Sequence, residues 1–332
     1  MKLNEILKQT QNNHIIYESF EKADKLLNHS GYKNIVVSIS GGADSDIMID
    51  MCERLEAKVH YIFFNTGIEY QATFEHLDYI ENKYGIKIER INALVPVPLG
   101  CKKYGIPFLS KHVSEFVGGL QKHDFTWEDE SYDDMLQKYP LTFAKWWHNK
   151  YRNEGFKSSQ WDVDYNRYLK EFLIENPPTF QISKRCCEGA KKNVSKKYMK
   201  EHDVDLMLIG IRKAEGRIRA AKYKTCFGQQ HGVDQYRPLF WYTNQDKEDY
   251  DRIFGVTHSR CYTEYGFKRT GCACCPYEKN FDAELEIIKE KEPKLYKAVN
   301  NIFGESYEYT RKYREFVAKK KQEEKEAKQS QQ

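Results

Sequence analysis

The chain has 332 residues, of which 40% are hydrophobic and 31% charged, and its formal net charge is +4. This composition predicts a globular protein with one large domain or two ordinary ones. No run of about 18 apolar residues occurs, so we expect no membrane span. The N-terminal MKLNEILKQTQNN lacks the apolar core of a signal peptide, and we therefore expect a cytoplasmic protein.

Helical and strand patterns alternate over the first ninety residues. Apolar residues recur at helical spacing up to about residue 29, and buried strands are predicted over residues 35–40, 59–64 and 86–91. A further buried strand is predicted over 205–211. Strands that alternate with helices imply a parallel sheet with crossover connections, so we expect an α/β fold.

The alternation stops at an aromatic-rich segment. Residues 101–180 contain 17 Phe, Trp or Tyr, or 21%, against 14% for the whole chain. We interpret this segment as a mostly helical insertion. Its aromatic side chains can pack a core of their own, or they can stack on nucleic-acid bases. The predicted domains are an N-terminal helix (1–30), a sheet domain (31–100 and 182–280), the insertion (101–181) and a charged helical tail (281–332).

The stretch IVVSISGGADSD at 35–46 places a Ser-Gly-Gly turn between a strand and a helix. Glycines let a ligand approach the backbone, and the N–H groups at a helix N-terminus attract anions. The hydroxyls of Ser40 and Ser45 add hydrogen-bond donors. The spacing GxxxxGK(S/T) of a Walker loop is missing. The turn is therefore predicted to cradle an anion, although a Gly-Gly pair alone would indicate only a tight turn and a helix cap.

Four motifs resemble one known superfamily. SGGADSD resembles the pyrophosphate loop (SGGxDS) of the ATP pyrophosphatases, which form the adenine-nucleotide alpha-hydrolase superfamily. FFNTGIEY (63–70), IGIRKAEGRIRA (209–220) and YGFKRTGCACCPY (265–277) resemble motifs of its phosphoadenosine phosphosulfate (PAPS) reductase branch, in the same order. The matches leave the insertion uncovered. The resemblance implies a Rossmann-like parallel sheet of the adenine-nucleotide alpha-hydrolase type, and ATP cleavage between the alpha and beta phosphates.

The resemblance also implies roles for the loop residues. The glycine N–H groups and serine hydroxyls would hold the departing pyrophosphate, and Asp44 would brace the loop or help to position Mg²⁺. Ala43 stands where many relatives carry lysine, and Arg212 or Arg219 would compensate for the missing charge. Asn65 replaces the usual aspartate of the strand-end motif, which weakens the case for a metal there. The predicted catalytic residues are Asp44, Ser45, Arg212 and Arg219, and the predicted nucleotide-binding residues are Ser38, Ser40, Gly41, Gly42, Asp44, Ser45, Asn65, Thr66, Gly67, Gly210, Arg212 and Glu215.

Nine cysteines in a chain expected to be cytoplasmic favour metal, redox chemistry or packing over disulfides. Four thiolates can hold zinc, but adjacent cysteines diverge, whereas the four irons of a [4Fe–4S] cluster each take one thiolate. The order CC…CxxC resembles the cluster motif of adenylylsulfate reductases. It implies a [4Fe–4S] cluster on Cys186, Cys187, Cys272 and Cys275, with zinc or no metal as alternatives.

The remaining cysteines receive weaker interpretations. Cys52 follows the apolar pattern of a helix and is predicted to lie in the core. Cys274 inside the CxxC is a bystander, a substitute ligand or a sulfur carrier, and Cys226 is a candidate persulfide carrier.

The charge distribution adds a hint about the substrate. Residues 182–225 carry 13 basic and 5 acidic residues, a local net charge of +8, which suits phosphates or nucleic acid. A solvated face is the alternative. DNA and RNA are therefore candidate partners.

The resemblance favours one activity over two alternatives. Sulfonucleotide reductases use a cysteine on a C-terminal tail and typically carry a degraded pyrophosphate loop, whereas this chain has an intact loop and no cysteine after Cys275. It looks more like the ATP pyrophosphatases of DNA phosphorothioation and tRNA thiolation. We thus expect an enzyme that adenylates its substrate, releases pyrophosphate and transfers sulfur through the cluster from a cysteine desulfurase or another donor. A PAPS or adenylylsulfate reductase, and a non-catalytic protein that binds nucleotide and cluster, are the alternatives.

Overall fold

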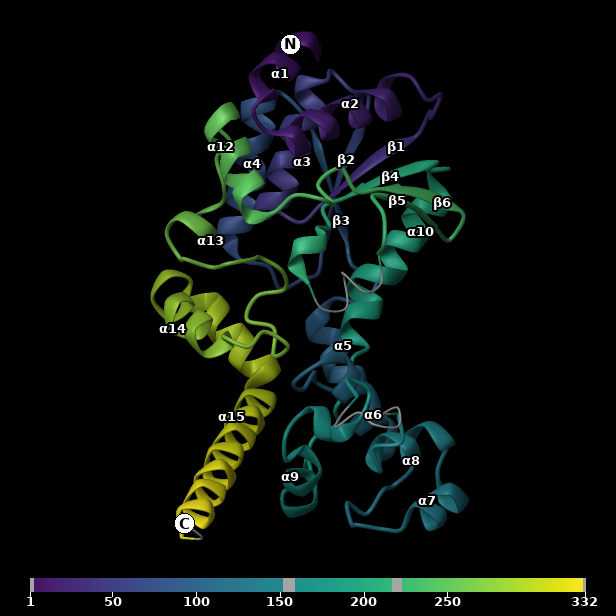
Figure 1. Ribbon diagram of the computed structural model, residues 1–332, viewed down its shortest axis with the longest axis vertical. Helices are drawn as coiled ribbons and strands as arrows, with labels where there is room; N and C mark the ends of the chain where they lie inside the picture. The colour runs from purple at the N-terminus through teal and green to yellow at the C-terminus, as the bar shows by residue number, and fades with distance from the viewer. Residues whose placement is uncertain (1–2, 152–158, 217–222, 331–332) are drawn as a thin grey trace. The chain divides into compact units, whose positions relative to one another are not determined.

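The structure is a computed structural model that describes residues 3–151, 159–216 and 223–330 (Figure 1). The chain divides into two compact units. The sheet unit comprises Met1–Pro96 and Ala190–Ala273, and the helical unit comprises Val97–Gly189 and Cys274–Gln332. The domain boundaries expected from the sequence stay a prediction. In this division the C-terminal residues group with the aromatic-rich segment.

A six-stranded sheet in the order β3-β2-β1-β4-β6-β5 forms the centre of the sheet unit. All neighbouring strands are parallel except β5, which runs antiparallel to β6, so the expected α/β fold with a mostly parallel sheet is confirmed. The four expected strands are present with shifted ends, whereas β5 and β6 were not predicted. The strands are β1 (Ile35–Ile39), β2 (His60–Asn65), β3 (Ile88–Asn92), β4 (Leu206–Ile209), β5 (Phe227–Gln230) and β6 (Val233–Tyr236).

Helices cover both faces of this sheet. The N-terminal segment, expected to be one helix, forms two, because Asn13 caps the second by accepting a hydrogen bond from the backbone of Ile16. The helical elements of the sheet unit are α1 (Leu3–Thr10), α2 (His14–Asn28), α3 (Ala43–Arg54), α4 (Gln71–Tyr84), α10 (Asn193–Glu201), the 3₁₀ turn Lys213–Glu215, α12 (Asn244–Phe254) and α13 (Arg260–Thr263).

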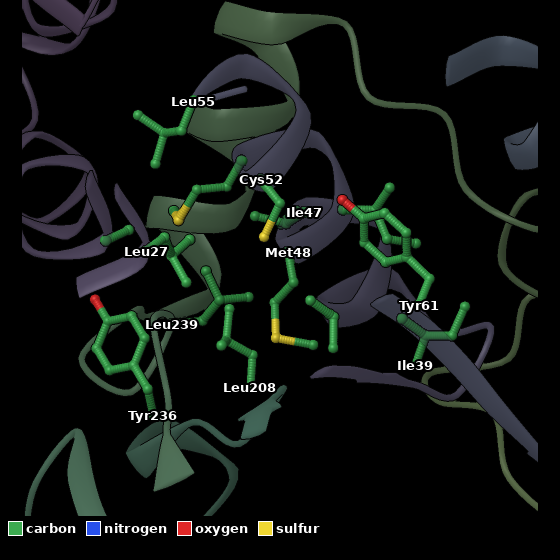
Figure 2. Close-up of a cluster of buried hydrophobic side chains, with 14 of the residues drawn as sticks. Leu27, Ile39, Ile47, Met48, Cys52, Leu55, Tyr61, Leu208, Tyr236 and Leu239 are labelled. Carbon is green, nitrogen blue, oxygen red and sulfur yellow. The ribbon is translucent and has the colours of Figure 1, made fainter. Parts of the chain in front are cut away.

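Side chains from alternate strand positions enter two separate cores. Val37 and Leu208 face the larger core, which α1, α2, α3, α4 and α12 cover, whereas Val36 and Met207 face a smaller core beneath α10. Figure 2 shows part of the larger core, where Cys52 lies among apolar side chains as predicted. Burial on both faces explains why these strands read as continuous apolar runs.

The helical unit packs its aromatic residues against one another. Trp146, Trp147 and Phe172 are fully buried in one core, to which Tyr309 and Tyr313 also contribute. The expected mostly helical insertion is confirmed, and the alternative in which its aromatics fill their own core holds for these residues. The helical elements are α5 (Val97–Tyr104), α6 (Lys111–Gln121), α7 (Tyr132–Lys138), α8 (Leu141–Trp147), the 3₁₀ turn Val163–Tyr165, α9 (Leu169–Glu175), α14 (Phe281–Lys291) and α15 (Pro293–Gln329), and the π-helical segment Glu188–Lys192 leads out of the insertion.

The described residues include no helix with a stretch long and apolar enough to cross a bilayer.

The strand order fixes where a ligand site can form. From β1 the chain proceeds to β2 and β3 on one side and later returns as β4 on the other side. The connections that follow β1 and β4 therefore diverge, and open α/β sheets bind ligands in the crevice at the carboxyl ends of such strands. Ser40 and Gly210 follow these two strand ends directly.

Candidate active site

The turn after β1 contains the predicted anion cradle. It begins at Ser40, and Gly42 is the N-cap of α3. The backbone N–H of Ser40 donates to Oγ of Ser45 at 2.9 Å, and the two Oγ atoms lie 3.1 Å apart. Gly42 has no side chain to cap the first N–H groups of α3. This helix end therefore combines hydroxyl donors with the partial positive charge that favours an anion.

Hydroxyl groups enclose the space beside Gly42. A Cβ atom at this position would lie 2.8 Å from Oγ1 of Thr270, 2.9 Å from the hydroxyl of Tyr262 and 3.3 Å from Oγ of Ser40. Burial raises the pKa of Tyr262, so its hydroxyl stays protonated and can donate. Any side chain at Gly42 would collide with the Thr270 and Tyr262 hydroxyls, so only a bare backbone lets these hydroxyls approach the start of α3 so closely.

Gly41 is required for a different reason. Its φ is +67°, a conformation that L side chains rarely adopt, and a Cβ atom would lie 2.6 Å from Cγ2 of Thr73 on α4. Both glycines of the motif are thus explained by local geometry.

Two cations share the carboxylate of Asp44. Nε of Arg212 lies 3.2 Å from Asp44, and Nζ of Lys247 on α12 lies 2.6 Å from Oδ1. Arg212 is itself held in place, because its Nη1 donates to the Tyr242 carbonyl at 3.4 Å and to Oδ1 of Asn244 at 3.1 Å. Two cations therefore lie beside the loop on a single carboxylate.

Asp46 lies at the base of the loop between two histidines. It is 2% exposed, and its oxygens accept from Nε2 of His76 at 2.9 Å and from Nδ1 of His258 at 2.8 Å. Burial alone would raise the pKa of Asp46, but the hydrogen bonds from His258 and His76 lower it. Burial disfavours the charged form of His258, yet its hydrogen bonds to Asp251 and Asp46 raise its pKa to about 9. At neutral pH this is therefore a buried ion pair that fixes the first turn of α3.

The end of β2 contributes a second polar cluster. Oγ1 and the backbone N–H of Thr66 donate to Oε1 of Glu69 at 2.6 and 3.2 Å. Sγ of Cys272 donates to Oγ1 of Thr66 at 3.6 Å. Burial raises the pKa of Glu69, and Lys191 opposes this shift. Oδ1 of Asn65 accepts from the N–H of Gly67 at 2.9 Å, which is the geometry of a turn residue.

The predicted cysteine ligands fall in both units. Cys186, Cys187 and Cys275 belong to the helical unit and Cys272 to the sheet unit. The pKa of the Cys186 thiol is raised, chiefly by a hydrogen bond with Cys101. A hydrogen bond with Cys187 lowers this pKa, whereas burial and the nearby Cys275 raise it further. Thiols thus gather around Cys186, including one from α5 that the sequence did not single out. Among the described residues, no group of three or more His, Cys, Asp or Glu is arranged to hold a metal ion.

Three further predicted nucleotide contacts have structural positions that limit their roles. Ser38 lies within β1, paired in register with Ile62 and Ile209. At Gly210 a Cβ atom would lie 3.3 Å from Cβ of Asp44, so this glycine lets Asp44 approach. The carboxylate of Glu215 accepts from the N–H of Arg212 at 3.0 Å. Arg219 lies outside the described residues.

Sequence reasoning missed several residues at the loop. Lys247, Tyr262 and the two histidines lie far from the loop in the chain and in segments without a distinctive pattern. Thr270 could have been predicted from the sequence, because it belongs to the motif YGFKRTGCACCPY.

Comparison with known proteins gives a family match and two relatives. A model of the phosphoadenosine phosphosulfate reductase domain matches residues 34–144 and 121–278. An uncharacterised protein of Methanocaldococcus jannaschii is 25% identical over 284 residues, which are 82% of this chain and 42% of that protein. Adenosine 5'-phosphosulfate reductase 2 of Bacillus subtilis is 27% identical over 130 residues, which are 33% of this chain and 55% of that protein. This chain therefore spans roughly half the length of these two curated relatives.

Solved structures with similar chain traces are more distant. A PAPS reductase from Candida auris, in complex with phosphate, has a TM-score of 0.43 at 11% identity and covers 81% of this chain and 94% of its own. The U34-tRNA thiolase NcsA from Methanococcus maripaludis, with its [4Fe–4S] cluster, has a TM-score of 0.38 at 14% identity and covers 92% and 79%. The NH3-dependent NAD synthetase of Campylobacter jejuni has a TM-score of 0.35 at 11% identity and covers 94% and 95%. All three TM-scores are below 0.5, too low to carry a conclusion on function.

Proposed function

The chain belongs to the phosphoadenosine phosphosulfate reductase domain family, and on that premise we propose that it cleaves ATP between the alpha and beta phosphates and adenylates a substrate. The observation that carries this proposal is the set of hydroxyls that gathers against Gly42 at the N-terminus of α3. The cations of Arg212 and Lys247 lie next to it. Such a site suits the phosphates of a nucleotide rather than a neutral ligand.

The chemistry follows from where negative charge develops. A substrate oxygen would attack the alpha phosphorus, the bond from that phosphorus to the bridging oxygen would break, and pyrophosphate would leave with the electron pair. Hydrogen-bond donors that are already in position stabilise such charge without reorganising. Ser40, Ser45 and Tyr262 supply hydroxyl donors, and the first turn of α3 supplies its dipole. The buried Asp46–His258 pair would keep that turn fixed during the reaction.

The rest of the nucleotide would extend towards the end of β2. Asn65, Thr66 and Gly67 are the proposed contacts for ribose or adenine. Glu69, whose carboxylate already accepts two hydrogen bonds from Thr66, is an additional acceptor suited to a ribose hydroxyl.

Mg²⁺ is the ion that ATP chemistry would bring to this site. A carboxylate oxygen such as that of Asp44 is a suitable ligand for it. In the described arrangement, however, Asp44 is engaged by Arg212 and Lys247 and lies in no cluster of acidic groups. The residues as placed do not form a cation site.

The cysteine set suits an iron–sulfur cluster by its chemistry. Cys186, Cys187 and Cys275 lie in one unit with Cys101 near Cys186, and Cys272 precedes Cys275 by three residues. Thiolates in such numbers are the ligands that [4Fe–4S] clusters use. We propose Cys186, Cys187, Cys272 and Cys275 as ligands, and the bound cluster would supply the sulfur-transfer chemistry that follows adenylation. A nucleic-acid substrate and a separate sulfur donor such as a cysteine desulfurase complete this proposal.

The test measures pyrophosphate release from ATP by anaerobically purified protein, with RNA, DNA or no nucleic acid present. Wild-type protein should release pyrophosphate, and Ser45→Ala should release it about tenfold to a hundredfold more slowly, because one charge-assisted hydrogen bond is lost. Ser30→Ala, an exposed serine before β1, is the matched control and should match wild type.

One outcome favours the alternative activity. The relative from Bacillus subtilis is an adenosine 5'-phosphosulfate reductase, so the same preparations should be given adenylylsulfate and PAPS with a thiol reductant. Sulfite formation without pyrophosphate release from ATP would overturn the adenylation proposal. Binding of nucleotide without either product would indicate the non-catalytic alternative.

A further inference from the structure

We propose that Lys247 is a phosphate-binding residue that moves from Asp44 onto the phosphates of the bound nucleotide. This inference rests on the proposed function and adds a residue that neither the loop motif nor the family match identifies. Lys247 lies in the first turn of α12, far along the chain from the loop. Its ammonium group nevertheless contacts the loop directly, 2.6 Å from Oδ1 of Asp44.

The loop itself lacks positive charge. SGGADSD contains two serines and two aspartates but no basic residue. A pyrophosphate group carries several negative charges, so the loop needs cations from elsewhere in the fold. In the described part of the chain, Arg212 and Lys247 are the two cations paired with the loop residue Asp44.

The two cations differ in how firmly their side chains are held. Besides Asp44, Arg212 donates to the Tyr242 carbonyl and to Asn244, so its guanidinium is fixed. The described contacts of the Lys247 ammonium consist of its ion pair with Asp44. Lysine has a flexible four-carbon stem with a compact charge at its end, so a rotation can carry the charge from a carboxylate to a nearby phosphate.

Hydrogen bonds hold the backbone near Lys247 in place. The hydroxyl of Thr243 caps α12, and the carboxylate of Asp246 accepts from the N–H and hydroxyl of Thr243 at 2.8 and 2.7 Å. Asn244, between them, also binds Arg212. The start of α12 is thus rigid and joined to Arg212, which leaves the Lys247 side chain as the adjustable part. Its side chain is 18% exposed, so its charge is only partly screened.

The test uses inorganic pyrophosphate as the probe, with binding measured by calorimetry, and ATP turnover as the second readout. Lys247→Met keeps length but removes charge, and it should weaken pyrophosphate binding about tenfold to a hundredfold, the loss of one charged hydrogen bond. Lys247→Arg should restore most of the affinity. Arg252→Met is the matched control, because Arg252 lies on the same helix and pairs with Asp249 rather than with the loop.

The Asp44→Asn variant distinguishes phosphate binding by Lys247 from a role in which Lys247 only holds Asp44. If Lys247 only holds Asp44, then Lys247→Met should have no further effect once Asp44→Asn has removed the carboxylate charge. If it contacts phosphate, the weakening should persist in the Asp44→Asn background. If the wild type splits ATP and Lys247→Met still binds pyrophosphate with wild-type affinity, this inference is overturned and the proposed function stands. A wild type that neither binds pyrophosphate nor splits ATP overturns the proposed function, and this inference with it.

Discussion

The loop region of the sheet unit buries charged side chains, whereas the core of the helical unit buries aromatic ones. Around the start of α3, buried charges pair with one another, as Asp46 does with His76 and His258. In the helical unit, aromatic rings pack in contact, with the ring centroids of Phe116 and Trp146 5.2 Å apart. Paired buried charges cost free energy to desolvate, whereas packed aromatic rings chiefly stabilise the fold. We therefore expect the nucleotide chemistry at the loop of the sheet unit, and a chiefly stabilising role for the aromatic core of the helical unit.

The largest expected effect on stability comes from a substitution in the aromatic core of the helical unit. Trp146→Ala should lower the free energy of unfolding by about 3 to 5 kcal/mol, because it removes a fully buried ring and leaves a cavity. Denaturant unfolding followed by circular dichroism measures this change. Trp161→Ala is the control, since Trp161 is 47% exposed, and it should change stability by less than about 1 kcal/mol. Equal effects of the two substitutions would contradict the proposed division between buried and exposed aromatics.

The same contrast explains how much of the fold the sequence predicts. β1 and β4 were recognisable because IVVSI and LMLI are apolar runs buried on both sheet faces. β5 and β6 were missed because FGQQ and VDQY are short and polar, and only the pairing of β6 with β4 and of β5 with β6 makes them strands. The sequence alone left two roles open for the aromatic insertion, because composition does not distinguish a ring that packs from a ring that stacks on a ligand.

The candidate site divides in the same way. Ser40, Gly41, Gly42 and Ser45 were predicted because one continuous motif contains them. Lys247 and His258 were not predicted, since tertiary contacts alone bring them to the loop and no local pattern marks them.

The second prediction probes the polar side of the comparison by pH. His258 binds a proton more tightly in the folded state, where its pKa is about 9, than in the unfolded state, where it is about 6.5. Its contribution to stability is therefore complete below about pH 6.5 and is lost as pH rises through 9, by about 3 kcal/mol in all. Asp46 and Asp251 are the carboxylates that hold this proton, and Tyr262 packs against the ring.

The measurement is the free energy of unfolding at several values between pH 6.5 and 9. His258→Gln should reduce the fall in the free energy of unfolding between pH 6.5 and 9. His29→Gln should leave the slope unchanged, because His29 is exposed and pairs with Asp24 at the surface. A slope that survives in His258→Gln would show that another group governs this pH range.

The third prediction sharpens the role of the loop glycines. Gly31 and Gly41 both have positive φ, but a Cβ atom at Gly31 meets nothing within 4 Å, whereas at Gly41 it would meet Thr73 at 2.6 Å. Gly31→Ala should cost about 1 kcal/mol from backbone strain, and Gly41→Ala about 2 kcal/mol, because a steric clash is added. Thermal unfolding measures both. Thr73→Ser in the Gly41→Ala background should recover part of the loss, and no recovery would refute the clash.

The smallest expected change in stability concerns the surface of the two units. Residues 190–273 contain 17 basic and 10 acidic residues, whereas residues 97–189 contain 13 of each. Lys192 directly precedes α10, and Lys196 and Lys200 lie on it. All three are exposed and spaced four residues apart, so we expect them to share one face. If nucleic acid is the substrate, this face of the sheet unit, and not the aromatic insertion, should contact its phosphates.

Replacing these three lysines by glutamine should change the free energy of unfolding by no more than about 0.5 kcal/mol. The effect should appear in nucleic-acid binding, where the slope of log affinity against log salt should fall by about 2 to 3, close to one unit for each lost phosphate contact. Fluorescence anisotropy with labelled RNA and DNA at several salt concentrations measures this slope. The control replaces Lys312, Lys321 and Lys325, three exposed lysines of α15, and should leave it unchanged. If the slope falls only in the α15 variant, nucleic acid contacts the helical unit and not the sheet unit, which contradicts this prediction.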